Sequence, residues 1–142
     1  MKRHPALRPL SRDHHRALVI ARELRRATDQ TAAEAGAVFL SHWYAEEAQH
    51  FRVEEELLLP AYAAHGDPDH PAVLQMLIDH MLIRRDASRL TDRPPLELLH
   101  DLGARLRSHV ELEEREVFPL VEATIPEREL VELGERIRNA AR

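Results

Sequence analysis

The chain contains no cysteine. This absence excludes disulfides, thiolate zinc sites, iron–sulfur clusters and thioether-linked haem, so any bound metal must be held by histidine, carboxylate and water. Aromatic residues make up only 4% of the sequence. Alanine, leucine, glutamate and arginine dominate instead, and because these residues are strong helix formers we predict an all-α protein.

The chain also lacks a long apolar run and a block of like charge. Its longest nearly apolar stretch, Leu57 to Ala64, is too short to span a bilayer, and its basic start leads into no segment of signal-peptide length. The formal charge is −5 at a pI of about 6.0, with basic residues scattered among acidic ones, which argues against a nucleic-acid interface. We expect one cytoplasmic domain over residues 1–142, with neither a membrane nor a nucleic-acid partner.

One pattern, H-x-x-x-E-E-x-x-x-x-P, occurs twice, starting at His50 and at His109. Residues four apart are neighbours on one face of a helix, so each histidine and the first glutamate after it can converge on one metal ion. These first glutamates are Glu54 and Glu113. The second glutamate of each pair is expected to face solvent.

A lone histidine precedes each copy of this pattern and directly follows an aspartate, in Asp13-His14 and in Asp79-His80. Each half of the chain therefore reads as a helix with one histidine, a connection, and a helix with the repeated pattern. Two such hairpins predict an up-and-down antiparallel four-helix bundle. The aspartates could orient the ligands or could equally lie on the surface.

Helical periodicity predicts five helices. The first begins after Ser11 as its N-cap, the next three span about 31–64, 71–90 and 96–123, and a short extra helix covers about 126–138. The bundle proper covers about 8–123, and the extra helix is expected to pack across its end in a structural role. Pro60 and Pro119 are expected to mark a kink or a helix end. In the third helix, Leu77 is expected on the same face as His80.

Six residues on the inner faces are the candidate metal ligands: His14, His50, Glu54, His80, His109 and Glu113. Imidazole and carboxylate ligands favour first-row metals such as iron, manganese or zinc over calcium. Two alternatives stay open. His15 could replace His14, and Glu46 could be a seventh ligand or could pair with Arg84 or Arg105. The remaining histidines, His4, His42, His65, His70 and His100, are expected in loops or on helix flanks.

This order and spacing of ligands resembles the hemerythrin-like HHE cation-binding domain family over residues 8 to 123. The resemblance implies a four-helix bundle that holds a non-haem di-iron centre and binds oxygen or a related small ligand. It further implies that His14 and His50 serve one iron and His80 and His109 the other. Glu54 and Glu113 would bridge the two.

Two positions depart from the oxygen-carrying members of that family. Those carriers have a second histidine one turn before the third-helix histidine, where this chain has Met76. Their fourth-helix carboxylate falls five residues after the histidine, at Glu114 here, whereas the four-residue spacing of the broader family falls at Glu113. Both departures are typical of the broader bacterial family.

The function expected first is binding of oxygen, nitric oxide or peroxide at a di-iron centre, in sensing, detoxification or iron handling. One alternative is a di-iron oxidoreductase or repair enzyme, although the sequence indicates no separate substrate pocket. The other is a metal-free interaction bundle. Zinc or manganese could replace iron. The sequence leaves the oligomeric state open.

Overall fold

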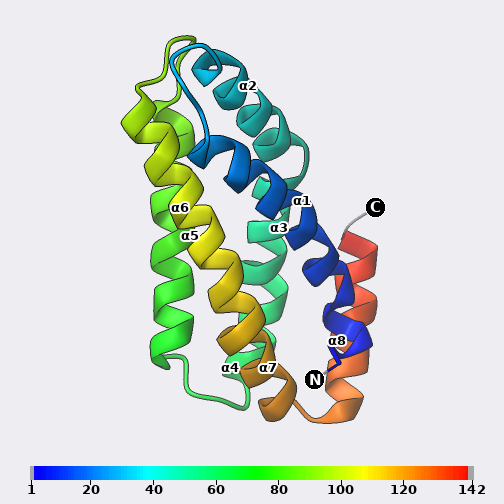
Figure 1. Cartoon of the computed structure of the whole chain (residues 1–142). Helices are drawn as coiled ribbons and strands as arrows, with labels where there is room; N and C mark the ends of the chain where they lie inside the picture. Colours follow the sequence, from blue (N-terminus) through cyan, green and yellow to red (C-terminus); the bar gives the residue numbers. More distant parts are fainter. Residues whose placement is uncertain (1, 141–142) are drawn as a thin grey trace.

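Helices make up nearly the whole molecule. The computed structural model describes residues 2–140, and no β-strand occurs in that range (Figure 1). The helical segments are α1 (Arg8–Arg25), the run from α2 (Ala32–His42) to α4 (Leu59–Ala63), α5 (Pro71–Arg89), the run from α6 (Leu96–Leu112) to α7 (Phe118–Thr124), and α8 (Glu127–Ala140). The all-α class predicted from the composition is confirmed. None of the described helices is long and apolar enough to cross a membrane.

The long helical segments lie side by side along the length of the molecule. In Figure 1, α1, the α2–α4 run, α5 and the α6–α7 run share one long direction, and α1 and α5 both pack on α6. The turn at residues 64–70 joins the first pair of segments to the second, where the sequence predicted the break between two hairpins.

The first helix begins earlier than predicted. A 3₁₀ turn, η1 (Pro5–Leu7), leads directly into α1, and the His4 side chain caps that turn. Ser11 therefore lies inside α1 and is not its N-cap. Its hydroxyl instead donates a hydrogen bond to Glu114 Oε2 at 2.7 Å.

Three π turns interrupt the two long runs. They are η2 (Trp43–Glu47), η3 (Glu54–Leu58) and η4 (Glu113–Val117), and α3 (Ala48–Val53) lies between the first two. Single π turns inside α-helices are rare and occur mainly at functional sites. Since η3 and η4 begin at the first glutamate of each repeated pattern, both copies have the same irregularity.

The prolines of the repeated pattern account for the position of these two π turns. Pro60 and Pro119 each lie two residues after the end of a π turn. A proline has no N–H to donate, and its ring collides with the carbonyl four residues earlier. The helix widens just before each proline, where the preceding residue donates its N–H to the carbonyl five residues back, at Glu54 or Glu113. The helix therefore continues through both prolines, and the predicted irregularity is a π turn.

The C-terminal helix lies along the start of the chain, and its expected position across the end of the bundle was wrong. Figure 1 shows α8 (red) beside the first turns of α1 (blue). A Cβ atom on Gly134 would lie only 2.8 Å from the Cα of Ala6, so the glycine allows α8 and η1 to approach closely. Leu130, Leu133 and Ile137 bury the apolar face of α8 in this contact.

Two apolar clusters fill the interior, and several helices pass from one cluster into the other. In α1, Leu10 belongs to the first cluster, Ala17 belongs to the second, and buried His14 lies between them. In α5, His80 follows Met76 of the first cluster by one turn. The polar side chains are thus held between two apolar layers, which exclude water from them.

Candidate metal centre

Six buried polar side chains meet between the two apolar clusters, and each is at most 3% exposed. They are the candidate ligands predicted from the sequence: His14 of α1, His50 of α3, Glu54 of η3, His80 of α5, His109 of α6 and Glu113 of η4. Each of the four long segments therefore contributes one imidazole. The two segments with the repeated pattern add one carboxylate each.

These residues form two groups of four that share both glutamates. Glu54 and Glu113 join His14 and His50 in one group and join His80 and His109 in the other. Within each group, one possible ligand atom from every residue lies within 4.8 Å of the others. Atoms so close together can coordinate a single ion, and two ions held in this way would have both glutamates in common.

Several inward-facing atoms have no hydrogen-bond partner among the residues that the structure describes. They are Nε2 of His50, His80 and His109, both carboxylate oxygens of Glu54, and Oε2 of Glu113. They nevertheless lie close together: Nε2 of His109 is 3.0 Å from Glu113 Oε2, and Nε2 of His50 is 3.2 Å from Glu54 Oε2. Buried polar atoms without partners are costly. A cation between them would satisfy all of them together, so the residues present fit a metal.

Each imidazole is also held from the outside by a carboxylate of another segment. The Nδ1 atoms of His14, His50, His80 and His109 lie 2.6, 3.0, 2.5 and 3.2 Å from Glu114, Asp13, Glu55 and Asp79, respectively. An ionised carboxylate can only accept, so Nδ1 is the protonated nitrogen and Nε2 of the neutral imidazole offers its lone pair inward. Such contacts fix the tautomer and orientation of metal-binding histidines.

The four contacts form a closed ring around the bundle. Each long segment supplies a carboxylate to the imidazole of the next segment along the chain, and the last segment supplies the first. Asp13 and Asp79, whose role the sequence left open, both take part. The expectation that Glu55 and Glu114 face solvent was wrong, because their side chains are only 25% and 33% exposed and each contacts an imidazole. The sequence did contain a sign of this role, because the second glutamate recurs in both copies of the pattern.

An arginine and a phenylalanine support one of these contacts. The guanidinium of Arg84 makes two contacts to Glu55, at 2.7 and 3.1 Å, and lies 5.7 Å from the centre of the Phe51 ring. Phe51 in turn stacks on His80 with a centroid separation of 3.9 Å. His80 is therefore fixed both through Nδ1 and over the face of its ring.

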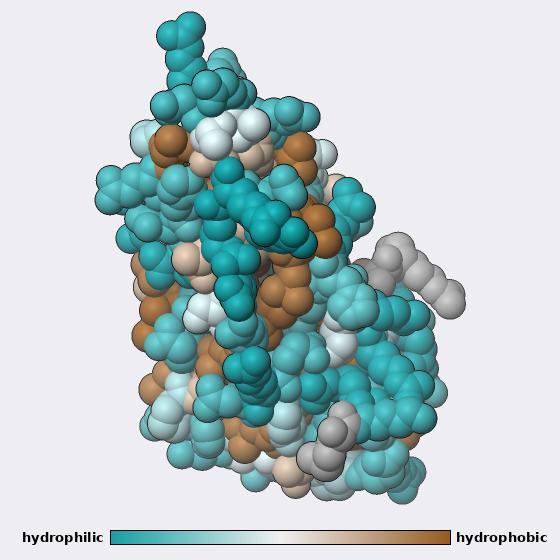
Figure 2. Space-filling model, viewed as in Figure 1, coloured by the Kyte–Doolittle hydropathy of each residue, from teal (hydrophilic) through white to brown (hydrophobic). Residues whose placement is uncertain are grey.

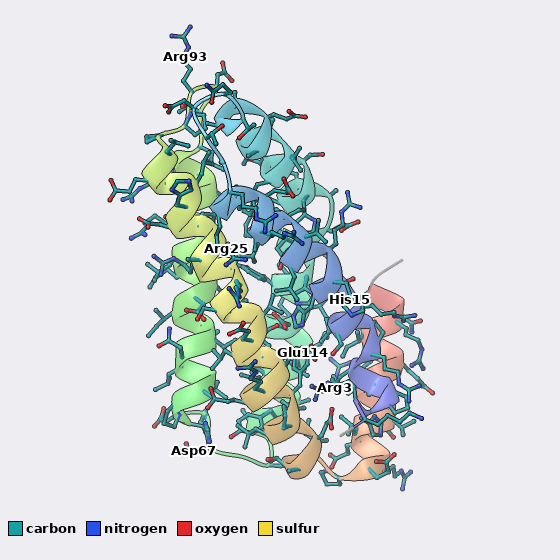
Figure 3. The ribbon with its side chains drawn as sticks, viewed as in Figure 1. Arg3, His15, Arg25, Asp67, Arg93 and Glu114 are labelled. Atoms are coloured by element: carbon teal, nitrogen blue, oxygen red, sulfur yellow. The ribbon has the colours of Figure 1, made fainter. Side chains whose placement is uncertain are left out.

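The same arrangement recurs in the other half of the site. Arg3, labelled with Glu114 in Figure 3, contacts a carboxylate oxygen of Glu114 at 3.1 Å and lies 5.3 Å from the centre of the Phe118 ring. Phe118 stacks on His14 at a centroid separation of 5.4 Å. The internal repeat of the sequence thus extends beyond the six inner residues to their outer supports, except that Arg3 comes from the segment before α1.

The imidazoles bind protons strongly when no metal competes. Burial opposes the charged form of His80, but the neighbouring carboxylates of Glu113, Glu54 and Glu55 outweigh it and raise its pKa to about 11. Burial likewise opposes the charged form of His14 and of His109, yet neighbouring carboxylates raise each pKa to about 9. The pKa of His50 is also well above its usual value, for the same reasons. A metal ion must therefore displace protons to bind.

The carboxylates show the opposite shift. Burial tends to raise the pKa of Glu55 and Glu114, but hydrogen bonds from an imidazole and an arginine lower both to about 2. The pKa of fully buried Glu113 also lies well below its usual value, because the charge of His109 and hydrogen bonds from the imidazoles outweigh its burial. Glu55 and Glu114 are ionised at neutral pH and accept the Nδ1 protons of His80 and His14, whereas Glu113 lies 2.7 Å from Nε2 of His14.

The two alternatives left open by the sequence lie outside the cluster. His15 is exposed on α1, as Figure 3 shows, so it does not replace His14. The side chain of Glu46 is 51% exposed and contacts His42 at 3.2 Å and Arg16 at 3.6 Å. Glu46 is therefore not in the ligand cluster, and its cationic partner is neither of the two arginines named from the sequence.

A further buried pair lies in the α2–α3 region. His42 was expected on a helix flank, but it is only 4% exposed, and its Nε2 lies 2.6 Å from Glu47 Oε2. Burial would raise the pKa of Glu47, yet the hydrogen bond from His42 lowers it. The π turn η2 accounts for the error, because its wider turn brings residues five apart onto one face.

A cleft of about 160 Å³ lies at the surface beside the centre. Its lining residues are Pro9, Leu10, Asp13, Ala45, Glu46, Gln49, His50, Val53 and Ile137. The cleft therefore lies among α1, the η2–α3 region and α8, with a ligand-cluster residue, His50, in its wall. Its mixed lining offers a small molecule a path toward the buried site.

Comparison with known proteins agrees with this geometry. No curated protein sequence matches the chain. A family model described as the hemerythrin HHE cation binding domain matches residues 6–121, which span all four helical segments that supply the buried cluster. The chain belongs to the hemerythrin HHE cation-binding domain family.

Proposed function

We propose that the protein holds two metal ions per chain, with iron as the native metal, and that this centre binds oxygen or a related small ligand such as nitric oxide or peroxide. The observation that carries the proposal is the pair of four-residue groups that share Glu54 and Glu113. Two ions with two ligands in common are the arrangement of a carboxylate-bridged centre, which helical bundles hold between facing helices.

His14 and His50 would hold one ion, His80 and His109 the other, and the two glutamates would bridge them. The long segments would form an up-and-down four-helix bundle around the centre, with α8 as an addition. Zinc and manganese also bind imidazole and carboxylate ligands, so the donor set favours a first-row metal without selecting one.

When bound, an iron pair supplies redox-active positions at which a small ligand can coordinate. The protein residues prepare that site. The ring of outer carboxylates keeps each Nε2 lone pair directed inward, and the stacked phenylalanines Phe51 and Phe118 keep two of the rings in place. Four protein ligands per ion leave positions free at an octahedral metal.

The surroundings favour a small ligand over a large substrate. The ligand cluster itself is buried, and the cleft beside His50 has a volume of only about 160 Å³. Met76, fully buried one turn before His80, presents a thioether where an additional imidazole would otherwise complete the second group. The space near the centre therefore suits a diatomic molecule or peroxide.

A metal-free interaction bundle is less consistent with the structure. Without a cation, four imidazoles and two carboxylates would be buried together as charged groups, and burial of so many charges is costly. Sensing, detoxification and iron handling are all compatible with the proposed site. A cytoplasmic location, a single domain and the lack of a nucleic-acid partner remain part of the proposal.

The test is elemental analysis of protein purified under anaerobic conditions, together with its optical spectrum before and after oxygen is admitted. We expect about two iron ions per chain and a new charge-transfer band when oxygen or azide is added. His109→Ala should reduce the metal content, whereas the control His15→Ala, on the exposed face of α1, should not. Protein that contains no first-row metal after expression with added iron, zinc and manganese would contradict the proposal.

A further inference from the structure

The outward face of α5 is apolar along two full turns. Leu74, Leu77, Ile78 and Met81 follow the spacing i, i+3, i+4 and i+7, which places them in one stripe. They are 44, 39, 44 and 61% exposed. Leu77, which the sequence placed with the inner face beside His80, belongs to this outer stripe. Figure 2 shows apolar atoms along the edge of the molecule where α5 lies.

The inward face of α5 already serves the core and the candidate metal centre. Val73, Met76, His80 and Ile83 are buried there. The outer stripe therefore leaves much of its apolar surface unburied in a single chain, and this lowers the solubility of an isolated one. A contiguous stripe on one helix differs from the single exposed apolar residues found on most protein surfaces and is typical of an interaction site.

Charges at the two ends of the stripe have opposite sign. Asp67 and Asp69 are exposed in the turn that leads into α5, and Figure 3 shows Asp67 at this end. Arg85 and Arg89 follow Met81 by four and eight residues, so they continue the stripe on the same face at the other end, and both are exposed. The acidic end and the basic end are thus separated by the apolar stripe.

We propose that this face of α5 binds the α5 of a second copy of the chain, in an antiparallel pair related by a two-fold axis between Leu77 and Ile78. In a two-fold interface each patch must be complementary to itself. An antiparallel pair meets this condition, because the acidic end of one copy faces the basic end of the other and the apolar residues meet in the middle. A parallel pair would place like charges together.

The distances along the helix agree with this pairing. With a rise of about 1.5 Å per residue, Arg85 lies roughly 11 Å from the axis and Arg89 roughly 17 Å. On the other side the helix begins at Pro71, roughly 10 Å from the axis, and Asp69 lies in the turn just before it, so the acidic end of one copy would face the arginines of the second copy. A single pair of helices buries less surface than a standard interface, so the dimer is expected to be weak.

The dimer does not depend on the proposed metal function. The side chains of the stripe point away from the buried cluster, so association can be measured whatever the metal content of the protein. The test is sedimentation velocity of the full chain from about 10 μM to about 1 mM, the range in which weak association is detected. We expect the mass to rise from the 16.4 kDa of one chain toward twice that value.

Ile78→Glu should keep the protein monomeric throughout this range, because two glutamates would meet at the axis. The control is Val131→Glu, which adds the same charge on the solvent-facing side of α8, where Val131 is 46% exposed. This variant should dimerise like the wild type. Asp69→Arg and Arg89→Asp should each weaken the dimer at least about tenfold, and the double variant should recover it.

Three results would overturn the proposal. The first is a wild-type protein that remains at the mass of one chain at all concentrations. The second is equal loss of association in the Ile78 and Val131 variants, and the third is failure of the double charge reversal to restore association. Circular dichroism and the thermal unfolding transition verify that each variant is folded, whatever its metal content.

Discussion

Glu55 accepts a hydrogen bond from the Nδ1 of His80 at 2.5 Å, across two helical segments and 25 residues of sequence. Glu55 directly follows Glu54, which belongs to the inner cluster, so adjacent glutamates face two sides of the same imidazole. Both glutamates lie in the π turn η3, which begins at Glu54. The pair Glu113 and Glu114 does the same for His14.

Replacement of a carboxylate that contacts an imidazole Nδ1 should weaken metal binding, even though every candidate metal ligand is kept. Glu55→Gln replaces the charged acceptor of His80 Nδ1 with a neutral amide, and we expect metal affinity to fall about 10- to 100-fold. Competition between the metal-free protein and a zinc chelator measures this change. The control is Glu56→Gln, which alters an exposed neighbour and should leave the affinity unchanged. Equal affinities in both variants would show that Glu55 does not support the centre.

Stability of the metal-free protein should be greatest in mildly acidic solution. His14, His80 and His109 have pKa values of about 9 to 11 in the folded state, above the value of 6.5 for an unfolded histidine. Their contribution is complete below pH 6.5 and is lost as the pH rises through 9 to 11. Glu55 and Glu114, at about 2, contribute above pH 4.5 and lose this contribution as the pH falls toward 2.

The melting temperature of the metal-free protein is therefore expected to have its maximum between about pH 4.5 and 6.5. Metal affinity should change in the opposite sense, because ions compete with protons for the same imidazoles and bind more tightly as the pH rises. The difference in melting temperature between metal-loaded and metal-free protein should therefore grow from pH 5 to pH 8. Calorimetric scans over this range measure both curves. A metal-free protein that becomes more stable toward pH 9 would contradict the raised pKa values of the imidazoles.

A bulky residue at the rim of the cleft should slow ligand binding. Ala45 is exposed and lines the cleft beside His50, so Ala45→Trp fills the path from the outside without overpacking the core. We expect the association rate of azide or nitric oxide with the metal-loaded protein to fall at least about tenfold while metal content is unchanged. Stopped-flow absorbance measures the rate. The control is Ala37→Trp, at an exposed position of α2 outside the cleft. Similar association rates in both variants would show that the ligand enters by another path.

The crossing of α1 and α6 depends on a glycine. A Cβ atom at Gly103 would lie 2.7 Å from the carbonyl oxygen of Ala21 and 2.8 Å from the side chain of Arg25. We expect Gly103→Ala to lower the free energy of unfolding by about 1–3 kcal/mol, because the backbone of α1 must move. Urea denaturation measures this change.

Gly36→Ala is the matched control. The nearest atom to a Cβ there is Pro94 Cγ at 3.2 Å, which can shift slightly, and alanine is favoured over glycine in a helix by about 1 kcal/mol. Its stability should be equal to or above that of the wild type. If the two variants were equally stable, the close approach at Gly103 would not limit the packing of α1 on α6.

The sequence was sufficient for the helical class and for the boundaries of most segments, because local propensity and apolar periodicity decide both. The third predicted helix, 71–90, differs from α5 by one residue at its end. The errors came where contacts between distant residues decide the outcome. Ser11 does not cap α1, since the residues before it form the 3₁₀ turn η1. The helix α8 packs beside Ala6, a contact that no local sequence pattern indicates.

By itself the sequence identified the six buried residues of the ligand cluster, because helical spacing places residues four apart on one face, as in His50 and Glu54, but it missed the buried pair His42 and Glu47. Only the tertiary structure decided which groups surround each imidazole. The carboxylate that accepts each Nδ1 proton comes from another segment, and for His80 and His14 it is Glu55 and Glu114, which the sequence placed in solvent. Such contacts depend on the relative position of helices, which packing of the whole bundle determines and local sequence does not.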